Sequence, residues 1–238
     1  AAGLGDPEAA ALGVLNQEEE VLLADEERLD FLPHRWTPVG GGNPMPHLSP
    51  PTLTASEQKS ILRAAAGHPR DHLIYSLALG TGLRLAEIVG LNVGDVFAPD
   101  GTPRSRVRVR PEIAKGGRSG DVFLPDALVT KLKKFWAHTG RRGEGIEPGD
   151  PLFCSQSRVR ISKRRVQFAW REWQQKAGFD RLYPFHGLRH TSVTNVYRKT
   201  RDLFLAQRFA RHVSPLTTTI YTHPSDEELF ERLRGMPC

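Results

Sequence analysis

Three short segments place polar residues that can do chemistry among apolar neighbours, and the first of them is GTGLRLAEI at residues 80–88. Arg84 stands between two leucines just after a glycine turn, and Glu87 follows three residues later. Residues three apart share a helix face, so the Glu87 carboxylate could hold the Arg84 guanidinium in place. An ordinary surface ion pair is the alternative. Neither GxGxxG nor a Walker GKS or GKT sequence follows, so this is not a nucleotide-binding loop.

The second segment is the glycine-rich turn AKGGRSG, which contains Lys115. A lysine on a flexible turn can carry its ammonium group into a cleft and donate a proton there. The alternative is a solvated charge, which is the usual state of an exposed lysine.

The third segment is FHGLRH, which His212 and Tyr221 follow later in the chain. Its histidine His186 and arginine Arg189 are three residues apart and share a helix face. His186 and His190 have the i, i+4 spacing of a metal-binding pair, but no HExxH pattern and no nearby Asp, Glu or Cys accompanies them, so we predict no metal site. Tyr221 lies in a polar run, TTTIYTH, with little apolar cover. That favours a chemical role, with a structural tyrosine as the alternative.

The elements that must position these residues are mostly helical by hydrophobic periodicity. An acidic helix is predicted over residues 7–31, and a linker rich in Gly and Pro over 38–51. Thr54 and Glu57 form a capping box at the start of the next helix. Helices are predicted near residues 55–66, 70–79, 85–90, 126–138, 163–177, 187–199, 203–210, 215–221 and 225–234.

The predicted β structure is small. RVRVR at residues 106–110 alternates Arg and Val with the period of a half-buried strand, and residues 121–124 form a second strand. Residues 92–97 are a candidate third strand. The expected fold class is therefore mainly α with a small antiparallel β-sheet (α+β).

Composition narrows the class of protein. The 238 residues are 39% apolar, enough for a sizeable core, and no run of 18 apolar residues is present. The N-terminus lacks the basic and apolar regions of a secretory signal. Cys154 and Cys238 are far apart and lack CxxC spacing, which argues against a zinc site or a disulfide scaffold and favours a reducing, intracellular compartment.

Charge is distributed unevenly along the chain. Residues 1–34 contain nine acidic residues and one basic residue, a net charge of −8. Because the whole chain has a net charge of +6, residues 35–238 carry +14. A body this basic is a candidate binder of polyanions.

Taken together, the three segments resemble the tyrosine recombinases, which include phage integrases and Xer-type resolvases. The catalytic domain of that family has an arginine in a TGLR-x-x-E segment, a lysine in a β-hairpin, an H-x-L-R-H box, a His or Trp, and then the tyrosine. The matching residues here, in order, are Arg84, Lys115, His186, Arg189, His212 and Tyr221. His212 follows Arg189 by 23 residues, and Tyr221 follows nine residues later. The resemblance covers about residues 52–232.

The sequence departs from the family pattern in two places. Family members often have L-G-H before the penultimate position, where this chain has Ala210-Arg211-His212. The family also carries a helical core-binding domain ahead of the catalytic domain, whereas only about 50 residues, with many acidic side chains, precede it here. We therefore divide the chain into an N-terminal segment and linker at 1–50 and a catalytic domain at 51–238.

The resemblance implies breakage and rejoining of DNA through a 3′-phosphotyrosyl bond to Tyr221, without metal, ATP or another cofactor. Arg84 and Arg189 would bind phosphate oxygens, because guanidinium groups are permanently charged and fork onto phosphate. His212 would hydrogen-bond a non-bridging oxygen, and His186 would help to take the Tyr221 proton. Lys115 would protonate the leaving 5′ oxygen.

The expected partner is double-stranded DNA with a specific recombination site. Basic residues leading into a helix capped by Ser162 would bind it, namely Arg158, Arg160, Lys163, Arg164 and Arg165. A solvated basic face is the alternative. A helix at 225–234 would pack on a neighbouring copy, or on its own domain. We expect a cytoplasmic, nucleoid-associated protein from a prokaryote or mobile element, with no membrane partner.

Two further functions stay open from the sequence. A type IB topoisomerase-like enzyme uses similar residues to nick and relax DNA, although topoisomerases usually have a lysine or another basic residue where His186 stands. A non-catalytic DNA-binding relative would keep the fold, but the intact set of six residues argues against it.

Overall fold

A computed structural model describes residues 50–143, 146–221, 233–234 and 236. They belong to a compact unit that runs from Leu48 to Cys238. The predicted acidic helix at 7–31 lies outside the described residues, as do nearly all of the predicted linker at 38–51 and helix at 225–234. Within the described part, no helix is both long and apolar enough to cross a membrane.

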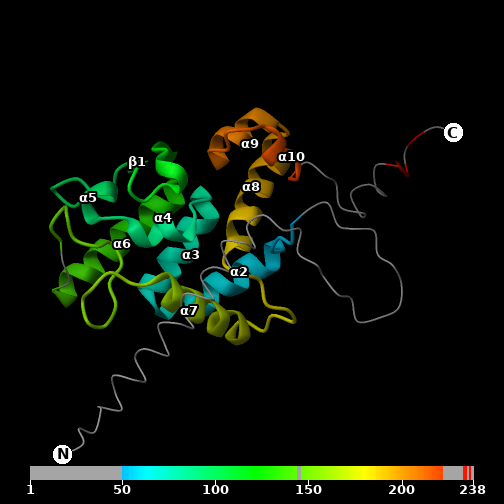
Figure 1. The fold of residues 1–238 in the computed structure, drawn as a ribbon. Helices are drawn as coiled ribbons and strands as arrows, with labels where there is room; N and C mark the ends of the chain where they lie inside the picture. Colours follow the sequence, from blue (N-terminus) through cyan, green and yellow to red (C-terminus); the bar gives the residue numbers. More distant parts are fainter. Residues whose placement is uncertain (1–49, 144–145, 222–232, 235, 237–238) are drawn as a thin grey trace, which may run out of the picture. The chain divides into compact units, whose positions relative to one another are not determined.

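The described residues are mostly helical and carry a two-stranded antiparallel sheet, which confirms the predicted fold class (Figure 1). The α-helices are α2 (Ala55–Ala64), α3 (Pro69–Thr81), α4 (Leu85–Gly90), α5 (Val93–Val96), α6 (Asp126–Arg142), α7 (Lys163–Lys176), α8 (His186–Thr200), α9 (Leu203–Ala210) and α10 (Leu216–Thr219). The remaining elements are β1 (Arg106–Val109), β2 (Gly120–Phe123) and the short 3-10 helices η1 (Ala65–Gly67) and η2 (Lys115–Gly117).

Two helix starts follow directly from capping side chains. At α2 the Glu57 backbone N–H donates to Thr54 Oγ1 at 3.2 Å, and the Thr54 N–H donates to Glu57 Oε2 at 2.7 Å, so the predicted capping box is confirmed. At α7 the Arg165 N–H donates to Ser162 Oγ at 3.2 Å, as predicted for that N-cap. Each cap satisfies backbone donors that have no partner inside the first turn of a helix.

The hairpin β1–β2 forms with Val107 opposite Val122 and Val109 opposite Gly120. The three valines are buried while the arginines between them are exposed, as the alternation of Arg and Val predicts. Arg106 and Asp121 add an exposed ion pair of 3.6 Å across the strands.

The candidate third strand at residues 92–97 is wrong, because the chain forms the short helix α5 there. The Asn92 N–H donates to Asp95 Oδ2 at 2.8 Å, and the Phe97 N–H donates to the Val93 carbonyl at 2.8 Å. Val93 and Val96 are both buried, and residues three apart share a helix face. Capping by a side chain three residues away therefore outweighs the β propensity of the two valines.

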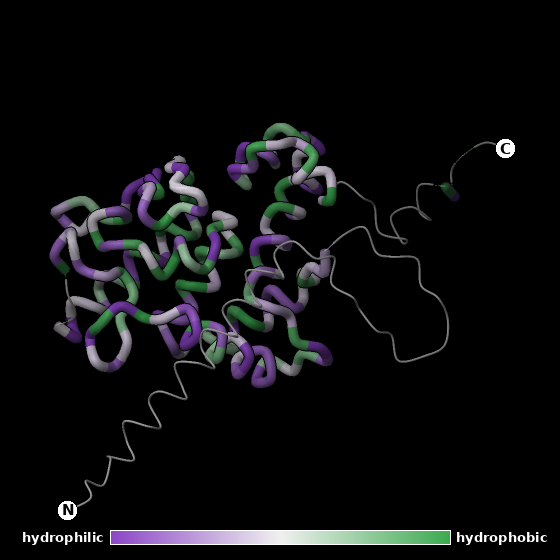
Figure 2. Tube along the Cα trace, viewed as in Figure 1, coloured by the Kyte–Doolittle hydropathy of each residue, from purple (hydrophilic) through white to green (hydrophobic). Residues whose placement is uncertain are grey.

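The helix α3 lies at the centre of the core, in contact with α6 and with α8. Residues 73–76 of α3 are all buried, and four consecutive residues go round a full turn, as expected for a helix covered on all sides. Figure 2 shows apolar and polar residues alternating along the surrounding helices, as on helices with one buried face.

A second, smaller apolar cluster joins α8 to α9 and consists of Val193, Ala206, Ala210 and Tyr221. The helix α8 connects this cluster to the main core, because the Ser192 hydroxyl donates to the Leu79 carbonyl of α3 at 2.7 Å. The candidate catalytic residues of the last third of the chain lie at this junction of α3, α8 and α9.

Candidate active site

A glycine turn between α3 and α4 positions Arg84. The helix α3 ends at Gly82, whose φ of 63° lies in the left-handed region that glycine adopts readily. A Cβ at Gly82 would also lie 3.0 Å from Phe209 Cε1, a tight contact, so the backbone conformation favours glycine and the packing adds to that preference. The chain then reverses and places Arg84 at the N-cap of α4.

The Glu87 side chain is 1% exposed, and its carboxylate forms ion pairs with two arginines. Oε1 accepts from Arg84 Nη1 at 3.2 Å, so the ion pair predicted from their spacing is present. Oε2 accepts from the Arg84 backbone N–H at 2.8 Å and from Arg211 Nη2 at 2.5 Å. The sequence did not predict Arg211 as a member of the site.

Arg189 is the most deeply buried cation among these residues, at 2% exposure. Its guanidinium donates to the Gly82 carbonyl at the end of α3 and to the Ala210 carbonyl at the end of α9. Burial, and then the neighbouring charge of Arg84, lowers the pKa of Arg189 to about 10. Arg189 therefore stays cationic at neutral pH and links two helix ends to α8 through one side chain.

His212 lies beside Tyr221, with ring centroids 6.1 Å apart and planes 18° from parallel. Its Nδ1 is 2.9 Å from Thr218 Oγ1. Burial, followed by the charges of Arg189 and Arg84, lowers the pKa of His212 to about 4. The imidazole is therefore neutral at pH 7, and when the Thr218 hydroxyl donates to Nδ1, Nε2 carries a hydrogen that can be donated to an anion.

The low pKa of His212 makes stability depend on pH. The unfolded chain binds a proton at His212 near pH 6.5, whereas the folded chain binds it only near pH 4. Neutral His212 therefore contributes its full share to the free energy of unfolding above about pH 6.5, and this share is lost as the pH falls through about 4. We expect His212→Gln to narrow the difference in melting temperature between pH 7.5 and pH 4.5. His138→Gln, on α6, is the control; an equal narrowing in both variants would contradict the prediction.

Tyr221 is only 5% exposed and packs against Val193, Ala206 and Ala210. The expectation of little apolar cover is therefore wrong for Tyr221 itself, since residues of α8 and α9 cover its ring. Burial raises the pKa of the Tyr221 phenol, whereas Arg189 and Arg84 lower it. A phosphate that approaches this hydroxyl therefore meets a largely buried oxygen that lies within the electrostatic influence of two guanidinium groups.

His190 contacts the Tyr221 hydroxyl, with Nδ1 2.8 Å from Oη. His186, which the resemblance assigns to this proton, packs edge-on against His190 at a centroid distance of 4.5 Å, and it contributes to the low pKa of His212. Two signals in the sequence pointed to His190: its i, i+4 spacing from His186, and its place as the last residue of the H-x-L-R-H box. Among the described residues, no group of three or more His, Cys, Asp or Glu side chains could hold a metal ion.

Lys115 lies at the exposed turn of the hairpin, in η2, next to two glycines with φ of 69° and 68°. The turn end of the hairpin reaches the site, because a Cβ at Gly120, the first residue of β2, would come within 2.9 Å of Arg211 Cδ. The structure therefore brings Arg84, Glu87, Arg189, His212 and Tyr221 together, with His186 alongside, and places Lys115 on a hairpin that borders them.

The basic residues predicted to bind DNA fall into two kinds. Lys163, Arg164 and Arg165 are exposed in the first turn of α7, where Arg165 also lies 5.4 Å from the Phe168 ring. Arg160 is also exposed, but its guanidinium is hydrogen-bonded to the protein itself. It donates to the carbonyls of Val89 and Leu91 at 2.8 and 2.9 Å and to Asn92 Oδ1 at 2.6 Å.

Arg158 precedes this anchored arginine by two residues and is exposed. Its φ of 59° places its backbone in the left-handed region, which only a few per cent of non-glycine residues adopt.

Comparison with known proteins identifies the family and the fold. Residues 51–228 match the model of the phage integrase family. The tyrosine recombinase XerC of Caldanaerobacter subterraneus subsp. tengcongensis is 31% identical over 189 residues, 78% of this chain and 50% of that protein. The chain spans about half the length of the curated relatives it matches.

Two solved structures share the fold. The crystal structure of XerA recombinase matches with a TM-score of 0.66 and 28% identity, over 83% of this chain and 68% of that one. XerH site-specific recombinase in a post-cleavage complex with a palindromic difH substrate matches with a TM-score of 0.64 and 25% identity, over 78% of this chain and 53% of that one.

Proposed function

Because the chain belongs to the phage integrase family, we propose that it is a site-specific DNA recombinase that breaks and rejoins DNA through a 3′-phosphotyrosyl bond to Tyr221. The observation that carries this proposal is the position of the Tyr221 hydroxyl in one cluster with two arginines and a neutral histidine. The partner we propose is double-stranded DNA, and the likeness to XerH site-specific recombinase, which was solved bound to its difH substrate, supports a site-specific substrate.

In the proposed reaction, Tyr221 Oη attacks a phosphodiester and forms an O–P bond while the bond from phosphorus to O5′ breaks. Arg84 and Arg189 stabilise the charge that gathers on the non-bridging oxygens, and His212 donates a hydrogen bond from Nε2. His190, at 2.8 Å from Oη, is placed to receive the phenolic proton. Lys115 supplies a proton to O5′. Attack by another 5′ hydroxyl on the phosphotyrosine reverses these steps and joins the strands.

Covalent capture on nicked DNA tests the proposal. A pool of duplexes with randomised sequence and a nick next to the scissile position allows the short 5′ product to diffuse away, so religation fails and the 3′-phosphotyrosine accumulates. The chain should form a denaturant-resistant adduct on a defined subset of sequences. No adduct would indicate a non-catalytic relative. Relaxation of supercoiled plasmid without sequence preference would instead indicate a type IB topoisomerase-like activity.

Arg160→Ala and Lys163→Ala should separate folding from DNA binding. Arg160→Ala removes three hydrogen bonds to the protein and should lower the free energy of unfolding by about 2 kcal/mol. Lys163→Ala, at an exposed position, should change stability by less than about 0.5 kcal/mol. It should instead make the slope of log K against log salt shallower by about 1, as for one lost phosphate contact. Melting curves measure the change in stability, and a salt titration of DNA binding measures the change in slope. A stable Arg160→Ala protein with a shallower slope, beside a destabilised Lys163→Ala protein with an unchanged slope, would refute these roles.

Self-association on DNA belongs to the same proposal, together with a cytoplasmic location and the division of the chain at residue 50. Phe204, Val213 and Leu216 are between 71% and 78% exposed around α9 and α10. The segment at 225–234 of a neighbouring copy could cover such an apolar surface. Sedimentation of the chain on a duplex with two captured sites checks this, and independent, non-cooperative binding of monomers would rule it out.

A further inference from the structure

Arg211 occupies a backbone position that favours glycine. It is the C-cap of α9, with φ of 55° and ψ of 40° in the left-handed region. This conformation is unfavourable for most residues with a Cβ, and glycine usually takes it at the end of a helix. The related family often has glycine here, in L-G-H, where this chain has Ala210-Arg211-His212. What an arginine contributes at this position must therefore come from its side chain.

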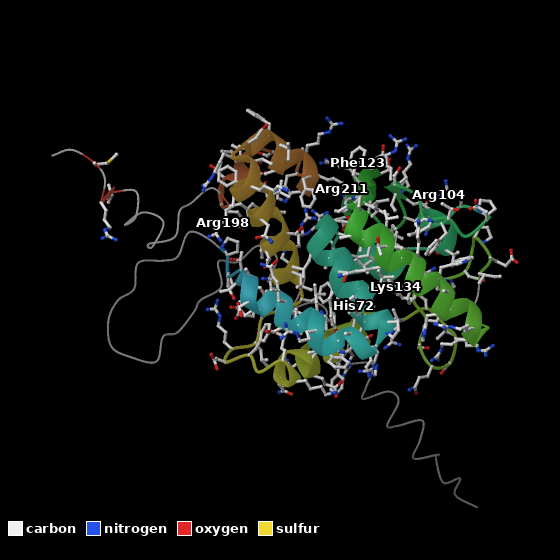
Figure 3. All side chains as sticks on the ribbon, turned by 180° about the vertical axis from the view of Figure 1, so that it is seen from behind. His72, Arg104, Phe123, Lys134, Arg198 and Arg211 are labelled. Carbon is white, nitrogen blue, oxygen red and sulfur yellow. The ribbon has the colours of Figure 1, made fainter. Side chains whose placement is uncertain are left out.

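The side chain of Arg211 is 14% exposed and joins two parts of the site. At its tip, Nη2 donates to Glu87 Oε2 at 2.5 Å. Along its stem, Arg211 Cδ lies close to Gly120 of the hairpin, where a Cβ would be only 2.9 Å from it. Figure 3 shows Arg211 at the end of α9 beside the part of the hairpin that carries Phe123.

The contact at Gly120 bears on where Lys115 lies. Gly120 begins β2 and pairs with Val109, and Lys115 lies in the turn between these two residues. The β1 side is secured by Arg110, which donates to Asp95 at 3.0 Å and to the Gly90 carbonyl at 3.0 Å. On the β2 side the stem of Arg211 lies against Gly120, so the glycine turn with Lys115 begins where Arg110 and Arg211 meet the two strands.

We propose that Arg211 is a positioning residue that fixes the hairpin against the buried Glu87 carboxylate and so directs Lys115 to the leaving 5′ oxygen. The inference rests on the proposed function, because it takes proton donation by Lys115 from there. When the bond from phosphorus to O5′ breaks, O5′ takes a proton from the Lys115 ammonium, and the electron pair of the broken bond becomes the new O–H bond. Arg211 itself transfers no proton.

Direct binding of phosphate by Arg211 is the competing role. The geometry favours positioning, because Nη2 is bonded to Glu87 and the stem is covered by the hairpin. The two roles differ in one measurable respect. If Arg211 positions Lys115, its loss slows the reaction only when the leaving atom must be protonated. If Arg211 binds the phosphate, its loss slows the reaction whichever atom leaves.

The first test compares Arg211→Gly on two nicked substrates of the sequence captured above. One has the natural phosphodiester and the other has sulfur in place of O5′, which leaves as a thiolate and needs no proton. We expect Arg211→Gly to slow adduct formation on the phosphodiester by roughly 100-fold, a typical cost of misplacing a catalytic group by about 1 Å. On the sulfur substrate it should be within about threefold of wild type, by the same reasoning. Lys115→Ala should follow the same pattern, while Arg84→Ala should be slow on both substrates.

Arg201→Gly is the matched control, since Arg201 is an exposed arginine at the left-handed C-cap of α8 with φ of 56°. Glycine relieves the same backbone conformation there without touching Glu87, so cleavage should equal that of wild type. If Arg211→Gly also equals wild type on the phosphodiester, or is slowed equally on both substrates, the positioning role is overturned.

A second test needs no reaction. Gly120→Ala places a methyl group against Arg211 and should lower the melting temperature of the wild-type chain by roughly 5 °C, as overpacking does. In a protein that already carries Arg211→Gly, the Gly120→Ala substitution should lower the melting temperature by less than about half as much. If Gly120→Ala lowers the melting temperature equally with and without Arg211, then Arg211 does not contact the hairpin at Gly120. A wild-type chain that forms no adduct would count against the proposed function, while this cycle would still decide whether Arg211 secures the hairpin.

Discussion

Replacing Tyr221 with phenylalanine should abolish the covalent adduct with nicked DNA while leaving the protein folded and able to bind DNA. The substitution removes only Oη, which is both the proposed nucleophile and the atom 2.8 Å from His190 Nδ1. The ring still fills its place among Val193, Ala206 and Ala210, so the free energy of unfolding should fall by no more than about 1 kcal/mol, the net value of one hydrogen bond.

Tyr197→Phe is the matched control for Tyr221→Phe. Tyr197 lies on α8 and packs against the same apolar cluster, but it is not at the cationic site. Its variant should form adduct at the wild-type rate. Peptide mass mapping of the wild-type adduct should locate the nucleotide on the peptide that contains Tyr221. Equal capture by wild type and Tyr221→Phe would show that another side chain is the nucleophile.

Arg189→Met should damage both the fold and the chemistry, because this one guanidinium serves both. Its loss leaves the buried carbonyls of Gly82 and Ala210 without their donor, which should cost about 2–4 kcal/mol of unfolding free energy. It also removes a positive charge beside Tyr221, and the loss of one such electrostatic contact typically slows catalysis by 10²–10³-fold or more. Denaturant melts and adduct formation measured below the melting transition separate the two effects.

Two further variants sharpen the prediction for Arg189. Arg189→Lys keeps the charge, but a single ammonium replaces a planar fork that reaches two carbonyls in different helices, so it should restore neither stability nor activity fully. Arg198→Met, an exposed arginine on the same helix, should alter stability by less than about 0.5 kcal/mol. An Arg189→Met protein as stable as wild type would contradict the role of these buried hydrogen bonds.

Most of the helices could be predicted because their signals are local. The first residues of α2 and α7 follow from Thr54 and Ser162, whose side chains accept hydrogen bonds from backbone N–H groups three residues later. The Arg and Val alternation of β1 likewise lies within a few residues. The error at residues 92–97 arose because two valines favour a strand, whereas the capping carboxylate of Asp95 favours a turn of helix.

The candidate site was only partly predictable. Types and order of residues identified Arg84, Lys115, His186, Arg189, His212 and Tyr221, and the roles assigned to them stay predictions. The contact between His190 and Tyr221 joins residues 31 apart, and that between Arg211 and Glu87 joins residues 124 apart. Neither leaves a periodic trace in the sequence, because each depends on how separate helices pack.

The sequence by itself determined which chemical groups this chain contains, its resemblance to a family, and most of the helices and both strands in the part that the structure describes. Side-chain type and short-range periodicity are properties of neighbouring residues, so they can be read without coordinates. Only the tertiary structure decided that Tyr221 is buried, that His190 is at its hydroxyl, and that Arg211 lies between Glu87 and the hairpin. These features depend on distances between elements, and the packing of the helices against one another determines those distances.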